Sequence, residues 1–136
     1  MSSTAGVESG MTIEKLSGFF DACNARDIDR LVSYFTNDGV YLASAGPDDD
    51  GTSFRGIDEV RRGFIAFFDT FPHGHYTHID LQVNGDRGTA KWTFTGTTRA
   101  EQGTITYRGV DIFEFDADKI LVKDAFRKER SDPIGS

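Results

Sequence analysis

The chain has 136 residues, a formal net charge of −7 and a sequence pI near 4.8. This length suits one compact domain with a single core. Lys and Arg occur singly or in pairs and never in a clustered stripe. The charge pattern therefore argues against nucleic acid and against an anionic membrane surface as partners.

The cysteine content and the first residues bear on the compartment. Cys23 is the single cysteine, which excludes an internal disulfide, and its place among apolar helical positions predicts a buried, inert thiol. Residues 1–10 lack the charged start and apolar run of a signal peptide or anchor. We expect a cytoplasmic protein with a disordered tail over residues 1–11, a single domain over residues 12–130 and a second tail over residues 131–136.

Apolar residues at helical spacing predict two helices at the start of the domain. The first follows Thr12, a plausible N-cap, and ends near residues 24–26. Asp27 then caps a shorter helix that reaches Phe35 and is closed by the turn at residues 37–39.

A third helix follows a short strand over residues 40–43 and a polar loop over residues 44–53. Its apolar stripe runs from Ile57 to Phe71 and supplies much of the core.

Two clusters of metal-ligating residue types do not fit a metal site. The aspartates at residues 48–50 lack the alternating spacing and closing glutamate of a calcium loop. His73 and His75 lie in a Pro/Gly break and His78 lies on the polar side of a strand, without a carboxylate or Cys at compact spacing. We expect no metal and no cofactor.

Four long strands are predicted in the second half. Residues 76–83 alternate, with Thr77, Ile79, Leu81 and Val83 on one face. A hairpin turn at residues 84–88 leads to a strand with Ala90, Trp92, Phe94 and Gly96 on one face. Residues 99–102 then turn the chain into a final hairpin over residues 103–128.

The final hairpin places one carboxylate, Asp111, in a row of aromatic residues. Alternation from Ile105 puts Tyr107, Phe113 and Phe115 on the same face as Asp111. If Asp118 takes the left-handed position of a three-residue loop, Asp111 pairs with Lys123, whereas a two-residue turn opposes Asp111 to Asp124. We favour the first register because it places opposite charges across from each other. A pair of opposite charges on a sheet face is more stable than a pair of like charges by about 1 kcal/mol.

In that register both faces of the hairpin carry apolar residues. Leu121, Lys123, Ala125 and Arg127 share the Asp111 face, and Ile120, Val122 and Phe126 join Val110 and Ile112 on the other. We expect helices to cover one face and a partner chain to cover the other.

The order of elements predicts an α+β protein with helices on one face of a mostly antiparallel sheet. This order of elements also carries six characteristic segments: FFDACNARDIDRLVSYFTNDG, FRGIDEV, FP, KWTFTGT, and GVDIFEFDADKI followed by KDAFRK. Together they make the chain resemble the nuclear transport factor 2-like superfamily and, within it, the SnoaL-like group. The resemblance covers residues 12–128. It implies a cone-shaped, strongly curved mixed or antiparallel sheet, a cystatin-like roll in which three N-terminal helices close a pocket. It also implies an outer sheet face that often forms a homodimer.

The resemblance also narrows the chemistry. In the ketosteroid isomerases of this superfamily, the aspartate that begins the D-x-F-x-F strand matches Asp111, but the catalytic tyrosine matches Phe19 and the base matches Ala43. Neither can donate or take a proton, so that activity is not expected. Epoxide hydrolases of the superfamily need an Arg two residues before an Asp, whereas Arg108 lies three residues before Asp111 and points away. SnoaL-like cyclases, which use acid/base chemistry without a metal, are the closest remaining analogy.

Asp111 is the main candidate for a functional residue. Aromatic neighbours remove water from an acid and raise its pKa, while Lys123 and Arg127 on the same face oppose that rise. A purely structural Asp111–Lys123 pair is the alternative. The pocket lining is expected to include aromatic residues that core packing would also explain: Phe19, Tyr41, Phe64, Phe68, Trp92, Phe94, Tyr107 and Phe113.

Three functions remain open at this point. The first is a cofactor-independent cyclase, isomerase, dehydratase or hydrolase acting on a small apolar carbonyl compound, with Asp111 as acid/base and Lys123 or Arg127 holding an oxyanion. The second is a non-catalytic module that binds an apolar or carboxylated ligand, with Lys123 or Arg127 as counter-ion. The third is a dimerisation module with a vestigial pocket.

Overall fold

The computed structural model describes residues 10–98 and 103–129. The predicted tail over residues 131–136 and the predicted turn over residues 99–102 lie outside the described residues, as does most of the tail over residues 1–11. Of that last range, Met11 is described and is buried in the core.

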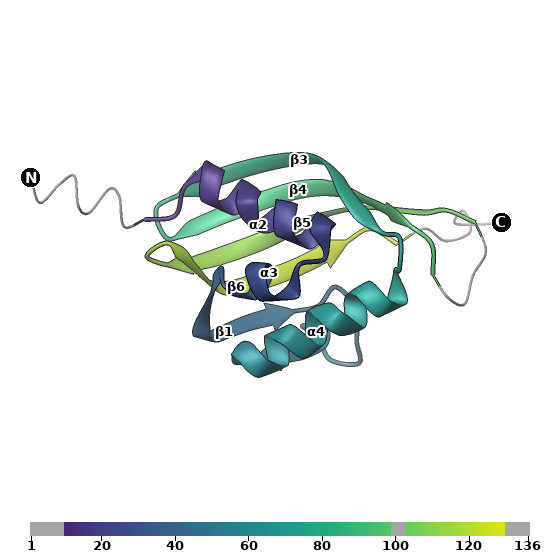
Figure 1. Cartoon of the computed structure of the whole chain (residues 1–136), viewed down its shortest axis with the longest axis horizontal. Helices are drawn as coiled ribbons and strands as arrows, with labels where there is room; N and C mark the ends of the chain where they lie inside the picture. Colours follow the sequence, from purple (N-terminus) through teal and green to yellow (C-terminus); the bar gives the residue numbers. More distant parts are fainter. Residues whose placement is uncertain (1–9, 99–102, 130–136) are drawn as a thin grey trace, which may run out of the picture.

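Within the described residues, three helices form near the positions that the apolar spacing predicts (Figure 1). Helix α2 (Ile13–Ala25) begins after Thr12, whose hydroxyl accepts a hydrogen bond from the Lys15 backbone N–H. Helix α3 (Ile28–Val32) is capped in the same way by Asp27, and α4 is Ile57–Thr70. No helix in the described part of the chain is long and apolar enough to span a membrane.

A six-stranded sheet lies behind these helices (Figure 1). Its strands are β1 (Phe35–Leu42), β2 (Ser53–Arg55), β3 (His75–Asn84), β4 (Arg87–Gly96), β5 (Ile105–Asp116) and β6 (Lys119–Arg127). The spatial order is β2-β1-β6-β5-β4-β3, with β1 parallel to β6 and the other neighbours antiparallel. The helices cover one face, which we call the inner face, and the other is the outer face. The predicted α+β class and curved mixed sheet are therefore confirmed.

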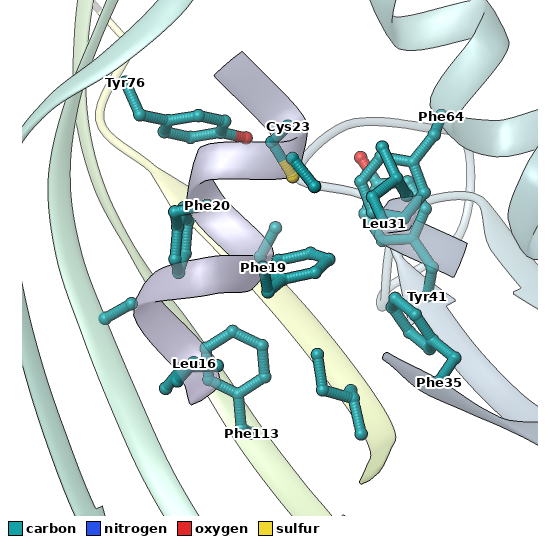
Figure 2. Close-up of a cluster of buried hydrophobic side chains, with 14 of the residues drawn as sticks. Leu16, Phe19, Phe20, Cys23, Leu31, Phe35, Tyr41, Phe64, Tyr76 and Phe113 are labelled. Carbon is teal, nitrogen blue, oxygen red and sulfur yellow. The ribbon is translucent and has the colours of Figure 1, made fainter. Parts of the chain in front are cut away.

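Aromatic side chains fill the space between helices and sheet (Figure 2). Phe64 of α4 stacks on Tyr41 of β1 with ring centroids 4.5 Å apart. Phe19 of α2 makes edge contacts with Phe64 and with Phe113 of β5. These contacts close the interior around the centre of the inner face.

The second predicted helix and its closing turn are wrong in extent. The helix ends at Val32, and Phe35 is the first residue of β1. Residues 37–39 lie within that strand, where its pairing with β6 jumps from Phe35↔Ile120 to Val40↔Val122. The extra residues bulge out of the ladder, because strand pairing here outweighs the local turn preference of Asn, Asp and Gly.

Both registers considered for the final hairpin are wrong. The turn is the two-residue Ala117-Asp118, with Ala117 rather than Asp118 in the left-handed region at φ 52°. A bulge then leaves Leu121 without an opposite residue, so that Phe113 faces Lys123 and Asp111 faces Ala125. The bulge also moves Ile120 to the inner side, where it is buried rather than outward as predicted.

A third irregularity changes the face assignment in β3. His78 has a φ of 52°, and the pairing with β4 shifts between Thr77 and Asp80. Tyr76 is therefore buried, whereas alternation without the shift had placed Thr77 with the apolar residues.

Candidate functional site

A buried ion pair joins β5 and β6 on the inner face. Asp111 and Lys123 are 0% and 1% exposed, and Lys123 Nζ donates to Asp111 Oδ1 at 3.1 Å. Because Ala125 lies directly opposite Asp111, Lys123 reaches the carboxylate along the diagonal of the strand pair. Sequence alternation predicted the common face of the two charges, but not this geometry.

Aromatic rings complete the surroundings of the Lys123 ammonium. Its Nζ lies 4.8 Å from the centroid of the Tyr41 ring and 5.7 Å from that of Phe64. Ring faces attract cations, and the attraction strengthens where water is excluded. Two ring faces and one carboxylate oxygen therefore hold the charge.

The two pKa values shift for different reasons. Burial raises the pKa of Asp111, while attraction and hydrogen bonding from Lys123 and the Trp92 indole oppose that rise. Burial alone would lower the pKa of Lys123, but the charge of Asp111, with smaller effects of Tyr41 and Cys23, raises it overall. Lys123 is therefore charged at neutral pH.

Two buried polar atoms beside this pair lack a partner at normal hydrogen-bond geometry. Within the described residues, neither Asp111 Oδ2 nor Trp92 Nε1 has a partner that meets both the distance and the angle of a hydrogen bond. The Trp92 indole is close enough to favour the ionised carboxylate, but it does not satisfy the free oxygen. Such atoms are uncommon in protein interiors and are usually paired with water or a ligand.

Arg127 lies one side-chain row away from Asp111 along the sheet. It opposes Gly109 across the strands, and its guanidinium lies 4.3 Å from the centroid of the Tyr107 ring. Its Nε donates to Glu129 Oε1 at 3.0 Å, and its Nη2 forms an ion pair with the same oxygen at 2.8 Å. The cation is thus held over a ring and already binds a carboxylate.

A small cavity on the inner face, here called the inner cavity, lies beside Arg127. Its volume is about 10 Å³, and it is lined by Ser44, Phe67, Tyr76, Trp92, Phe94, Tyr107 and Arg127. This is about the space that one water molecule needs. Asp111 does not line this cavity, nor any of three larger hollows found among the described residues.

Comparison with known proteins identifies the family. The family description "SnoaL-like domain" matches residues 16–122, which is most of the chain. This chain belongs to the SnoaL-like domain family. No curated protein matches it.

Solved structures agree with the SnoaL-like fold. An uncharacterised cystatin-fold protein of Novosphingobium aromaticivorans is 26% identical, with a TM-score of 0.69 over 88% of this chain and 100% of that one. A protein of Catenulispora acidiphila with a ketosteroid isomerase-like fold, in complex with trimethylamine, is 16% identical, with a TM-score of 0.75 over 85% and 86%. A candidate polyketide cyclase of Xanthomonas campestris is 15% identical, with a TM-score of 0.72 over 83% and 87%.

The aromatic residues predicted to line a pocket of the SnoaL-like domain divide into two groups. Trp92, Phe94 and Tyr107 line the inner cavity. The others pack in or against the core: Phe19, Tyr41, Phe64 and Phe113 are buried, and Phe68 is partly buried. Arg108 points to the outer face, as expected from its spacing to Asp111.

Sequence reasoning missed three residues of the inner cavity. Tyr76 was missed because the irregularity at His78 reverses the facing of β3. Phe67 lies beside the predicted apolar stripe of α4, and Ser44 lies in a loop without periodicity. Periodic patterns give no signal for positions of these kinds.

Two other kinds of site that the sequence raised are a reactive cysteine and a metal site. Cys23 is buried as predicted, at 2% exposed, and burial raises the pKa of its thiol to about 12, which disfavours the reactive thiolate. Among residues 10–98 and 103–129, no group of three His, Cys, Asp or Glu could hold a metal ion.

Proposed function

We propose that this SnoaL-like domain binds a small, largely apolar compound with a carboxylate or carbonyl group at the inner cavity, with Arg127 as its counter-ion. The observation that carries the proposal is the Arg127 guanidinium, which lies on Tyr107 at the edge of a cavity of aromatic rings and already holds the carboxylate of Glu129. A cation beside apolar walls is the arrangement expected in a binding site for an apolar carboxylic acid, because the cation pairs with the carboxylate and the walls contact the apolar part.

Binding requires the inner cavity to enlarge. Phe67 is partly buried and the Arg127 side chain is 16% exposed, so both can move without opening the centre of the core. Glu129, with 64% of its side chain exposed, is the group that a ligand carboxylate would replace. The Asp111–Lys123 pair then supports the wall of the site and makes no contact with ligand.

The test uses the single tryptophan of the chain, which lines the inner cavity. We expect 1-naphthoate to change Trp92 fluorescence in a saturable way and Arg127→Gln to weaken binding by roughly tenfold, since a charge-assisted hydrogen bond contributes about 1.5–3 kcal/mol. Lys128→Gln is the matched control because residue 128 belongs to the outer face. Equal loss in both variants, or none in either, contradicts the proposal.

A second candidate function is cofactor-independent acid/base catalysis on a small carbonyl compound, of the cyclase, isomerase, dehydratase or hydrolase type. The observation in its favour is Asp111, whose pKa burial raises and whose Oδ2 has no partner among the described residues. Asp111 would move the proton, and Lys123 or Arg127 would stabilise an oxyanion.

The variant Asp111→Asn separates the two functions. A catalytic Asp111 predicts that turnover falls by roughly 10²- to 10⁴-fold while 1-naphthoate still binds. Turnover that survives this substitution refutes the acid/base role and leaves the binding proposal intact.

We further propose that the chain forms a homodimer through the outer face. Ile112 of β5 is 43% exposed there, with the partly buried Val122 on the neighbouring strand. Exposed apolar side chains on an uncovered sheet face support association. Ile112→Asp should give a monomer in sedimentation velocity, whereas Ile65→Asp, at a 49% exposed position on α4, should leave the dimer unchanged. A monomeric wild type refutes this proposal.

We also propose a cytoplasmic location. It is supported by the lone Cys23, which is free and buried and so needs no oxidising compartment. Fluorescence microscopy of a tagged full-length chain tests it, and export from the cell would contradict it.

A further inference from the structure

The inner cavity has to open before a small molecule can enter it. Its volume of about 10 Å³ suits one water molecule, whereas sites for small molecules usually measure a few hundred cubic ångströms. Two of the residues that line it, Phe67 of α4 and Tyr76 of β3, flank the short connection between these two elements (Figure 1). The contacts that hold this connection in place therefore bear on the opening of the cavity.

The connection, residues 71–74, packs directly against the cavity wall. The centroid of the Phe71 ring lies 5.2 Å from that of Phe67 and 5.3 Å from that of Phe94, and both of these rings line the cavity. A Cβ atom added to Gly74 would collide with the Phe94 ring, so the backbone approaches this wall closely. Phe71 also ends α4, where its N–H donates to the Phe67 carbonyl. A displacement of Phe71 would therefore move the rings of the wall.

Arg26, which caps the C-terminal end of α2, holds the connection in place. Its Nη2 donates to the carbonyls of Phe71 and Gly74, at 2.9 and 2.6 Å. Its guanidinium also lies 5.0 Å from the centroid of the Phe68 ring of α4. A cation is favourable at the C-terminus of a helix, and the last turn of α4 has no basic residue of its own. We call the two hydrogen bonds of Nη2 the Arg26 clamp.

The backbone of Arg26 indicates that its side chain has a specific role. Its φ is 57°, in the left-handed region, where Gly or Asn is usually favoured at the end of a helix. An arginine at such a position is unfavourable unless its side-chain contacts offset the strain. The clamp is nevertheless incomplete, because Nη1 is buried without a hydrogen-bond partner among the described residues. Release of the clamp would give this nitrogen access to water, which makes opening less costly.

We propose that the Arg26 clamp keeps the inner cavity closed, and that its release lets residues 71–74 and the end of α4 move and admits the ligand. The identity of that ligand rests on the proposed function. When only the open state binds, the apparent affinity is reduced in proportion to the fraction of molecules that are open. Removing the clamp should therefore speed association and tighten binding, whereas a substitution that only damaged the fold would weaken binding.

Stopped-flow mixing with 1-naphthoate, followed by Trp92 fluorescence, measures the association rate. We expect Arg26→Gly, which suits the left-handed backbone, to raise both this rate and the affinity by roughly tenfold, because a charge-assisted hydrogen bond no longer opposes opening. Arg26→Asn should act in the same direction, since Asn also tolerates this backbone conformation. Arg61→Gln is the matched control: Arg61 of α4 pairs with Asp29 at the exposed surface, so the rate should not change.

A measurement without ligand separates failure of the clamp from failure of the proposed function. Acrylamide should quench Trp92 more strongly in Arg26→Gly than in wild type, because this residue is only 6% exposed while the cavity is closed. An unchanged association rate or weaker binding of 1-naphthoate in Arg26→Gly overturns the clamp and leaves the binding proposal intact. If 1-naphthoate binds to none of these proteins, the proposed function fails, and unchanged acrylamide quenching would then overturn the clamp as well.

Discussion

Removing the Lys123 charge is the sharpest test of the buried ion pair. Lys123→Met keeps most of the side-chain length but leaves the Asp111 carboxylate, 0% exposed, without its cation. The indole of Trp92 is the remaining group that favours the ionised form. We expect Asp111 to respond by taking up a proton in the folded state.

The cost of that proton sets the magnitude. From the ordinary pKa of 3.8, protonating a carboxyl at pH 7 costs about 4 kcal/mol, at 1.36 kcal/mol for each pH unit. This agrees with the roughly 3–5 kcal/mol lost when one partner of a buried pair is removed. At pH 5 the same step costs about 2 kcal/mol. At 1.36 kcal/mol for each of the two pH units, the destabilisation by Lys123→Met should therefore be smaller at pH 5 than at pH 7 by about 2.7 kcal/mol before the two costs are rounded.

Urea denaturation followed by circular dichroism measures these differences. Lys119→Met is the matched control, because Lys119 lies in the same strand, is exposed and donates to the Ser33 carbonyl, so its loss should cost less than about 1 kcal/mol. The double variant Asp111→Val/Lys123→Met should recover most of the stability. A loss below about 1 kcal/mol for Lys123→Met at pH 7, or an equal loss at pH 5 and pH 7, refutes the buried-pair reasoning.

Three further predictions concern the same interior. The pKa of Lys123 in the folded state lies above its ordinary value of 10.5, so its contribution to stability is complete below pH 10.5 and is lost as pH rises through the folded pKa. Above pH 10.5, urea midpoints should therefore fall more steeply for wild type than for the Asp111→Val/Lys123→Met variant. Parallel curves for the two proteins would contradict this. The Cys23 thiol, with a pKa of about 12, should react with an aromatic disulfide reagent at pH 8 only as fast as the chain unfolds, and a rapid reaction of the folded protein would show that the thiol is accessible. Gly109→Ala places a methyl group against the Phe126 carbonyl and the Trp92 ring, which should cost about 1–3 kcal/mol, and an unchanged melting temperature would show that this wall can yield.

The sequence predicts the fold and the facing of the key charges because both follow from periodicity. Asp111 in an aromatic row and Lys123 on the neighbouring strand need only the two-residue repeat of a strand. Their pairing could not be predicted, because the bulge at Leu121 depends on the curvature of the sheet and not on a local motif. The same limit explains Tyr76, whose facing is set by the left-handed backbone of His78.

The packing of the interior could not be predicted from the sequence for a different reason. Whether Phe64 and Tyr41 line a cavity or stack on each other depends on how far α4 lies from the sheet.

The most direct test of ligand binding is the indole N–H signal in a ¹H–¹⁵N spectrum, because the chain has a single tryptophan. Trp92 lines the inner cavity, and its Nε1 has no partner at full hydrogen-bond geometry among the described residues, so its resonance should respond strongly when a ligand enters the inner cavity. We predict that 1-naphthoate shifts this signal in wild type and in Lys128→Gln, but far less in Arg127→Gln. A signal that stays in place while the Arg108 and Phe126 amides move would contradict binding on the inner face.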